Sequence, residues 1–369
     1  MRGTYIDRWF LYLLIAVIIF GVIMLTSATL PIGFERYGDS YYFLKSHIIK
    51  GLIPGCIGAL LAYRYARILI SIPASTYFIA TIVLLALVFI PGIAADFGTT
   101  RSWIQLGPIS AQPAEFAKLS FILMLSLSLV KKSVEDRQDF HKGFLPFVAS
   151  FAVIAGLLIV QPDVGTLIIF SFIAISIYTA LGLTAKHAVY MCSAALVAIT
   201  ALIAAAPYRL ARFLSFLDPH SDVQGASYQL YQALLGIGSG GMLGLGLGHS
   251  RQKFLYLPEV SSDSVFAVIS EELGFIISVV FIFLIVALTL RGLKLAVRTR
   301  NETASAVMTG IMAWYFGQSF VNIGAIIGLI PLTGVPLPLI SHGGSATVSL
   351  LTAFGLLLAL SNGEHEKDV

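Results

Sequence analysis

The stretch SVFAVISEELGFIISVVFIFLIVALTL, residues 264–290, is long and apolar enough to cross a lipid bilayer. A helix of about 20 mostly apolar residues spans the hydrocarbon core. The same stretch carries two glutamates, Glu271 and Glu272, and follows directly on Asp263. Ionisable groups inside a span are costly and usually face protein or a wet cavity, so these acids mark a candidate functional site.

The composition of the whole chain agrees with a membrane protein. Of its 369 residues, 57% are hydrophobic and only 11% are charged, whereas a soluble domain carries about 25% charged residues. The net charge of +4 is too small to indicate nucleic acid as a partner. The first apolar run, 9–29, is too long for the core of a cleavable signal and is interpreted as a retained span. Cys56 and Cys192 both fall in apolar runs, which excludes a CxxC-type metal or redox site.

Apolar runs predict about ten transmembrane helices in a single all-α integral membrane domain, residues 1–369. The candidate spans are 9–29, 46–63, 69–91, 114–130, 144–161, 164–182, 187–206, 264–290, 304–330 and 344–361. The motif QPDVG separates two of them. Because Pro162 disfavours helix at the residue before it and Asp163 is a good N-cap, we expect a tight hairpin there.

The distribution of Lys and Arg predicts the orientation. Most of them fall in loops on the same side as the N-terminus, so both termini are expected to be cytoplasmic. Segments 92–113, 207–262 and 331–343 then lie outside, with 207–262 as a large extracytoplasmic loop between the seventh and eighth spans. Residues 362–369 are expected to form a flexible C-terminal tail.

The large external loop combines cations with glycines. Arg209, Arg212, Arg251 and Lys253 could reach the headgroup level of the bilayer, or could bind an anion such as a diphosphate; both interpretations stay open. A short helix, either amphipathic or re-entrant, is expected from Tyr228 to Ile237. The glycines that follow match GxGxxG, but no strand precedes them, so a dinucleotide site is rejected. They permit close backbone packing and positive φ, or else line a cleft that touches ligand.

Two further segments are expected to line the same external site. Glu115 and Lys118 are three residues apart in the fourth span and can pair, either as a structural pair or as a substrate contact. Arg101 precedes them in an external segment and is a further candidate substrate contact. The stretch GLIPLTGVPLPLISHGGSA, residues 328–346, holds three prolines, which prevent continuous helix. The candidate contacts in it are Ser341, His342 and Gly343.

Asp263 has two interpretations. It can cap the helix that begins near residue 264, or it can act as a general base at the mouth of a wet external cleft. Two serines beside it could also cap the helix. The two glutamates deeper in the span are consistent with a cleft that continues into the bundle.

Several long motifs resemble the SEDS family (shape, elongation, division and sporulation). They include QPAEFAKL at 112–119, QPDVGT at 161–166, DSVFAVISEELGF at 263–275 and LTGVPLPLISHGGSA at 332–346. The resemblance covers nearly the whole chain, and the SRQKFLYLPE form of the large loop is closer to the division branch than to the elongation branch. The sequence departs from the family at Ser261, Ser262 and Ser264, and at His342 and Ala346.

The resemblance implies a peptidoglycan glycosyltransferase of the inner membrane, with its active site outside. Its substrates would be lipid II and undecaprenyl-diphosphate-linked glycan, and its partners a class B penicillin-binding protein, other divisome membrane proteins and membrane lipids. Asp263 matches the essential aspartate of the family and would be the base of an inverting transfer. No cofactor is firmly implied, and a divalent cation, Mg²⁺ or Mn²⁺, stays open.

Three other functions remain as alternatives. Ten spans, broken helices and intramembrane charge pairs also suit a transporter that moves lipid II across the bilayer. A role as a scaffold for division proteins is a second alternative, but it would not explain the buried charges. A role in elongation and cell shape would use the same chemistry.

Overall fold

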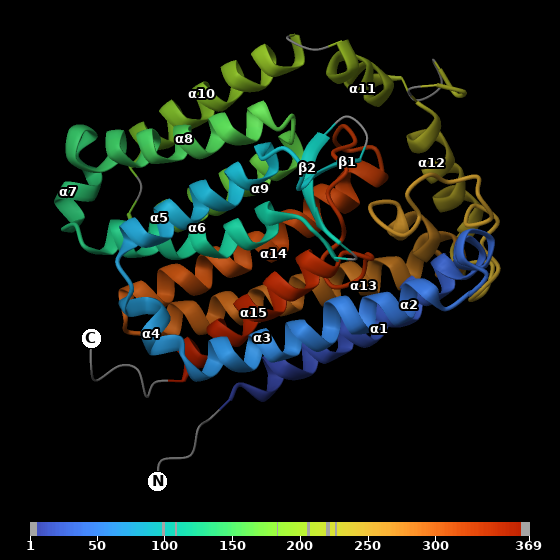
Figure 1. Cartoon of the computed structure of the whole chain (residues 1–369), viewed down its shortest axis with the longest axis horizontal. Helices are drawn as coiled ribbons and strands as arrows, with labels where there is room; N and C mark the ends of the chain where they lie inside the picture. Colours follow the sequence, from blue (N-terminus) through green and yellow to red (C-terminus); the bar gives the residue numbers. More distant parts are fainter. Residues whose placement is uncertain are drawn as a thin grey trace.

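The computed structural model describes residues 6–362, apart from 98–99, 108, 183, 205–206, 219–221 and 226. It is mostly helical, at 74%, and its longer helices lie side by side along the long axis of the molecule (Figure 1). The elements are α1 (Arg8–Tyr37), α2 (Tyr42–His47), η1 (Ile48–Leu52), α3 (Ile53–Arg64), α4 (Ala66–Ser71), α5 (Ala74–Ala86), η2 (Leu87–Phe89), β1 (Ala94–Phe97), β2 (Thr100–Leu106), β3 (Ile109–Ala111), α6 (Pro113–Val130), α7 (Val134–Gln138), η3 (Phe140–Phe144), α8 (Leu145–Val160), α9 (Val164–Ala180), α10 (Ala185–Ala204), α11 (Pro207–Leu217), α12 (Tyr228–Gly240), α13 (Val265–Arg298), α14 (Glu302–Ile326) and α15 (Gly344–Ser361).

Helices occupy the runs that the sequence predicted as spans. Within the described residues, six are long and apolar enough to cross a membrane: Arg8–Tyr37, Tyr42–Arg64, Pro113–Val130, Phe140–Val160, Val265–Arg298 and Gly344–Ser361. Two more apolar helices, Ala74–Phe89 and Val164–Ala180, are shorter. A multi-span helical protein is therefore confirmed, although α13 continues to Arg298 instead of ending near residue 290.

The predicted hairpin between α8 and α9 is present. Helix α8 ends at Val160, and α9 begins at Val164. The carboxylate of Asp163 caps α9 by accepting from the Thr166 backbone N–H at 3.0 Å and from its hydroxyl at 2.8 Å. A cap of this kind satisfies amides that the first helical turn leaves without partners.

The prediction of an all-α chain is wrong between residues 94 and 111. This segment forms a three-stranded antiparallel sheet in the order β1-β2-β3, in which Ala95 pairs with Trp103 and Ile104 with Ala111. Strands of 4, 7 and 3 residues are too short to appear as apolar runs of membrane-crossing length. The sheet leads directly into α6 and so fixes where the Glu115 helix begins.

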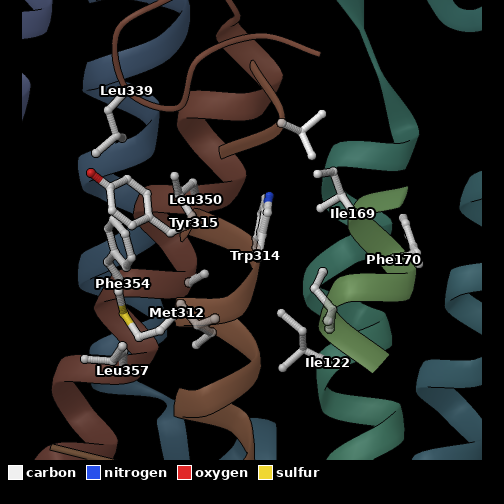
Figure 2. Packing of buried hydrophobic residues seen from close by; sticks show 14 of the residues in the cluster. Ile122, Ile169, Phe170, Met312, Trp314, Tyr315, Leu339, Leu350, Phe354 and Leu357 are labelled. Carbon is white, nitrogen blue, oxygen red and sulfur yellow. The ribbon is translucent and has the colours of Figure 1, made fainter. Parts of the chain in front are cut away.

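Helix α14 lies at the centre of the bundle, in contact with α6, α9, α13 and α15. Figure 2 shows Trp314 on the side of α6 and α9, and Tyr315 beside Phe354 of α15. The rings of Tyr315 and Phe354 meet edge to face, with centroids 5.5 Å apart. Because most residues of α14 are buried, a polar side chain at one of these buried positions must find its hydrogen-bond partner inside the protein.

Candidate functional site

The segment before α13 is held by the connection between α14 and α15, which we call the strap (residues 331–343). Three consecutive carbonyls, at positions 261–263, each accept a hydrogen bond. The His342 N–H donates to the first at 2.7 Å, the Ser341 hydroxyl to the second, and the Asn322 amide to the third, that of Asp263, at 2.8 Å. The strap therefore lies beside Asp263, which brings together two of the segments that the sequence predicted to share a site.

The Asp263 side chain is buried, at 6% exposure. Its carboxylate accepts a hydrogen bond from Gln229 Nε2 of α12 at 3.2 Å and lies 3.4 Å from the Ser264 hydroxyl. Helix α13 begins at Val265 with Ser264 as its N-cap, and no side chain caps it. The interpretation of Asp263 as the helix cap is therefore wrong, because the helix starts one residue later than that role requires.

Glu115 and Lys118 form the predicted pair on α6, with 2.7 Å between Oε1 and Nζ and exposures of 2% and 1%. Lys118 Nζ also donates to Gln318 Oε1 at 2.8 Å and lies 5.2 Å from the centre of the Trp314 ring. The lysine charge is thus met by a carboxylate, an amide oxygen and an aromatic face. Oε2 of Glu115 has no hydrogen-bond partner among the described residues.

Two amides of α14, Gln318 and Asn322, join these groups to the strap, and the sequence analysis missed them. Gln318 Nε2 donates to the carbonyl of Pro336 at 3.0 Å, and Asn322 Nδ2 donates to that of Val335 at 2.8 Å. The available signal was a pair of amides four residues apart in an otherwise apolar helix. Such residues share one helix face.

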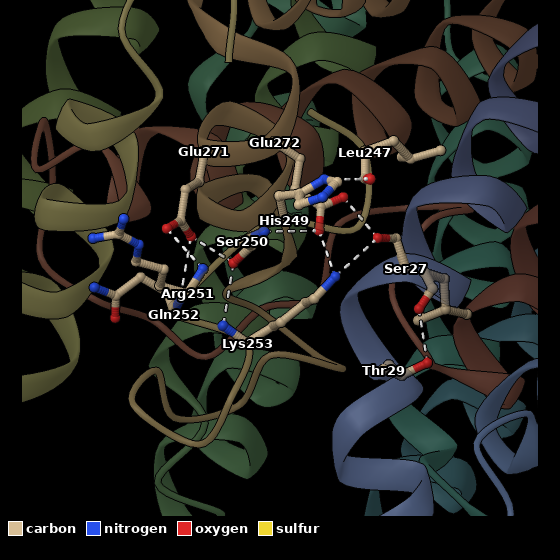
Figure 3. A network of polar contacts seen from close by, with 11 residues as sticks. Ser27, Thr29, Leu247, His249, Ser250, Arg251, Gln252, Lys253, Glu271 and Glu272 are labelled. Carbon is tan, nitrogen blue, oxygen red and sulfur yellow. Dashed lines mark hydrogen bonds and ion pairs between the residues drawn. The ribbon is translucent and has the colours of Figure 1, made fainter. Parts of the chain in front are cut away.

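Glu272 and Lys253 make a second buried ion pair (Figure 3). Their Oε1 and Nζ atoms are 2.7 Å apart, with exposures of 0% and 3%. The other carboxylate oxygen accepts from the Ser27 hydroxyl of α1 at 2.6 Å. Lys253 was predicted to bind substrate. In the structure its ammonium group instead pairs with the Glu272 carboxylate, and both groups are buried.

Glu271 anchors the same loop by a different set of contacts (Figure 3). Its carboxylate accepts from the Ser250 hydroxyl and from the backbone N–H groups of Arg251 at 2.9 Å and Gln252 at 3.3 Å. The two glutamates therefore fasten the loop to α13. They do not extend a wet cleft below Asp263, contrary to the interpretation from their spacing.

Helix α13 is interrupted at Gly274, where φ is 74° and ψ is −179°. The glycine-rich segment 241–246 lies against the break. Its amides donate to the carbonyls of Glu271 at 3.0 Å and Glu272 at 2.9 Å, and the Phe275 N–H donates back to it at 2.9 Å. The expectation that these glycines allow close packing and positive φ is confirmed, since the segment replaces the hydrogen bonds that the helix loses.

Replacing Gly244 by alanine should destabilise the protein by at least about 2 kcal/mol, because a side chain there adds left-handed strain to overpacking. Gly244 has φ +81°, and a Cβ on it would lie 2.2 Å from the carbonyl oxygen of Glu272. The measurement is the thermal unfolding midpoint in detergent. Gly238→Ala is the matched control, since a Cβ at Gly238 meets nothing within 4 Å. Equal midpoints for the two variants would contradict the role of Gly244.

The remaining predicted cations are not brought together by the described part of the chain. The Arg251 side chain is exposed, and only its backbone contacts Glu271. Arg101 lies in β2, and Arg209 and Arg212 lie in α11, but their side chains are outside the described residues. Helix α12, at Tyr228–Gly240, confirms the short helix predicted in this loop.

His342 and Gly343 lie where the strap enters α15. The His342 ring approaches the Ser46 hydroxyl, at 3.1 Å from Nε2, and packs edge-on against Phe43 of α2. Burial, with a smaller contribution from the Lys50 charge, lowers the pKa of His342 to about 4, so the ring is neutral at neutral pH. Gly343 is buried and is the N-cap residue of α15.

An apolar groove of about 500 Å³ lies between the end of α1 and the loop before α13. Its lining residues are Leu30, Pro31, Phe34, Glu35, Ser40, Gly248, Lys253, Phe254 and Leu255. Asp263 is not among them. The described residues hold no group of three or more His, Cys, Asp or Glu side chains that could bind a metal ion.

The chain is similar to known proteins over nearly its whole length. The family model of FtsW, RodA and SpoVE, described as "Cell cycle protein", matches residues 7–366. "Stage V sporulation protein E" of Bacillus subtilis (strain 168) is 35% identical over 341 residues, which are 92% of this chain and 93% of that protein. "Probable peptidoglycan glycosyltransferase FtsW" of Trichlorobacter lovleyi is 34% identical over 361 residues, 97% of this chain and 93% of that protein.

Solved structures agree with these relatives. A chain from the structure "Structural coordination of polymerization and crosslinking by a peptidoglycan synthase complex" has a TM-score of 0.82 at 26% identity, covering 99% of this chain and 100% of that chain. The rod shape determining protein RodA of Thermus thermophilus has a TM-score of 0.69 at 26% identity, covering 99% of each.

Proposed function

Because the chain belongs to the FtsW, RodA and SpoVE family of cell cycle proteins, we propose that it is a peptidoglycan glycosyltransferase that polymerises lipid II during septal wall synthesis. The observation that carries the proposal is that nearly the whole chain aligns with relatives named "Probable peptidoglycan glycosyltransferase FtsW". The site adds a carboxylate, that of Asp263. Asn322 of α14 donates to the Asp263 carbonyl, and Ser341 of the strap donates to the carbonyl of the preceding residue, Ser262.

Asp263 is the proposed general base. The 4-hydroxyl oxygen of an acceptor sugar attacks C1 of the donor glycan, the bond from C1 to the diphosphate breaks, and the Asp263 carboxylate takes the hydroxyl proton. One displacement converts an α-linked donor into a β-linked product, so a single inverting step suffices. General base catalysis of this kind contributes about 10²–10⁴-fold to the rate.

The departing diphosphate needs positive charge. Lys118 and Lys253 are each neutralised by a buried glutamate, so the proposed diphosphate ligands are Arg101, Arg209, Arg212 and Arg251. Guanidinium groups bind phosphate oxygens in a bidentate fork. Mg²⁺ and Mn²⁺ bind through one or two carboxylates together with substrate phosphates, so a divalent cation stays open as a further source of positive charge.

The proposed topology has ten spans with both termini in the cytoplasm, so that the site faces the extracytoplasmic side. Two contacts support this topology. The strap is hydrogen-bonded to the segment before α13, and the Gln112 N–H donates to the Ser345 hydroxyl at 3.1 Å. These contacts lie within or directly beside all three predicted external segments, which supports one shared side of the membrane for them. The proposed partners are a class B penicillin-binding transpeptidase and other divisome membrane proteins.

Reconstitution in liposomes tests the function. The purified chain, supplied with labelled lipid II with and without a candidate transpeptidase, should form glycan strands longer than the substrate. Movement of lipid II between leaflets without strand formation would instead identify a transporter. If neither product nor movement were seen with any partner, a scaffold would be indicated.

A further inference from the structure

Two primary amides are buried on one face of α14, one helical turn apart. Gln318 and Asn322 are each only 1% exposed. They hold the adjacent strap carbonyls of Pro336 and Val335, at 3.0 Å and 2.8 Å. A buried amide is costly unless it is hydrogen-bonded, so the two contacts fix the position of the strap along the axis of α14.

Each amide also contacts one of the two acidic centres of the site. Gln318 Oε1 accepts from Lys118 Nζ, the partner of Glu115, at 2.8 Å. Asn322 Nδ2 donates to the backbone carbonyl of Asp263 at 2.8 Å. One helix face thus joins the charged pair of α6, the strap and the proposed base.

We propose that Asn322 and Gln318 are positioning residues for glycosyl transfer, an inference that rests on the proposed function. They set where the Asp263 carboxylate lies without touching it, because Asn322 holds the peptide group of Asp263 and Gln318 holds the strap that carries Ser341. Small displacements of a reacting group can cost about 10²-fold in rate. If Gln318 and Asn322 served only helix packing, apolar side chains would be equally suitable at both positions.

The test is Asn322→Leu, which keeps the branched shape and the number of side-chain heavy atoms and removes both donated hydrogen bonds. The kcat for lipid II polymerisation, per folded molecule and with the partner transpeptidase present, should fall about 10- to 100-fold, while the KM for lipid II stays within about twofold. Ser319→Ala is the control on the same helix. Ser319 is 2% exposed, and its hydroxyl donates to the Tyr315 carbonyl of its own helix at 2.8 Å, so this variant should keep the wild-type kcat.

Gln318→Glu supplies a second measurement if Asn322→Leu does not fold. A glutamate still accepts from Lys118 and Trp314 but cannot donate to Pro336, so kcat should fall at constant KM. Wild-type kcat in either folded variant would overturn the proposal. The failure of the proposed function is distinct from this, since the wild-type chain would then form no glycan strands from lipid II with any partner.

Discussion

Replacing Asp263 by asparagine should reduce lipid II polymerisation by at least about a hundredfold, because general base catalysis contributes about 10²–10⁴-fold and an amide cannot accept the hydroxyl proton. The fold should survive the change. Asparagine has the shape of aspartate, its oxygen can still accept from Gln229, and the bonds to the carbonyls of 261–263 involve the backbone. The measurement is strand formation by the purified variant with its partner transpeptidase.

Glu259→Gln is the matched control for Asp263→Asn. It removes a carboxylate from the same segment, but from an exposed side chain. Its polymerisation rate should equal that of the wild type, and both variants should unfold at the wild-type midpoint. An Asp263→Asn protein that polymerises within tenfold of the wild type would exclude Asp263 as the base.

Replacing Lys253 by methionine should destabilise the protein by about 3–5 kcal/mol, because it leaves the fully buried carboxylate of Glu272 without its cation. Adding Glu272→Gln in the same chain should recover much of the loss, since no uncompensated charge is then buried. The measurement is the free energy of unfolding of the two single variants and the double variant, analysed as a double-mutant cycle.

Lys45→Met is the control for the Lys253 series. Lys45 forms a pair of similar length with Asp39, 2.7 Å, but the two side chains are 64% and 37% exposed. Exposed pairs contribute about 0–1 kcal/mol, so this variant should be close to the wild type. If the Lys253 variant is as stable as the Lys45 variant, or the double variant is no more stable than Lys253→Met alone, the anchoring role of the pair is wrong.

The sequence predicted the features that depend on local spacing. The hairpin at 161–163 and the pair of Glu115 with Lys118 involve residues no more than three apart in sequence. Apolar run length likewise located the helices, because membrane crossing sets a minimum length. The proximity of the strap to Asp263 also followed, since both lie at the same end of neighbouring spans.

The contacts that complete the site could not be predicted, because they join distant parts of the chain. Ser27 bonds to Glu272 across 245 positions, and Lys118 to Gln318 across 200. Lys253 was predicted to bind phosphate from its positive charge alone. Only the packed structure shows that the cation faces a carboxylate inside the protein.

The break at Gly274 also bears on biogenesis. The part of α13 before Gly274 depends on the segment 241–246 for hydrogen bonds that an uninterrupted helix would supply itself. In the hydrocarbon region, unsatisfied backbone groups cost several kcal/mol each. We therefore expect this part of α13 to insert into the membrane together with the preceding loop, and not as an independent transmembrane segment.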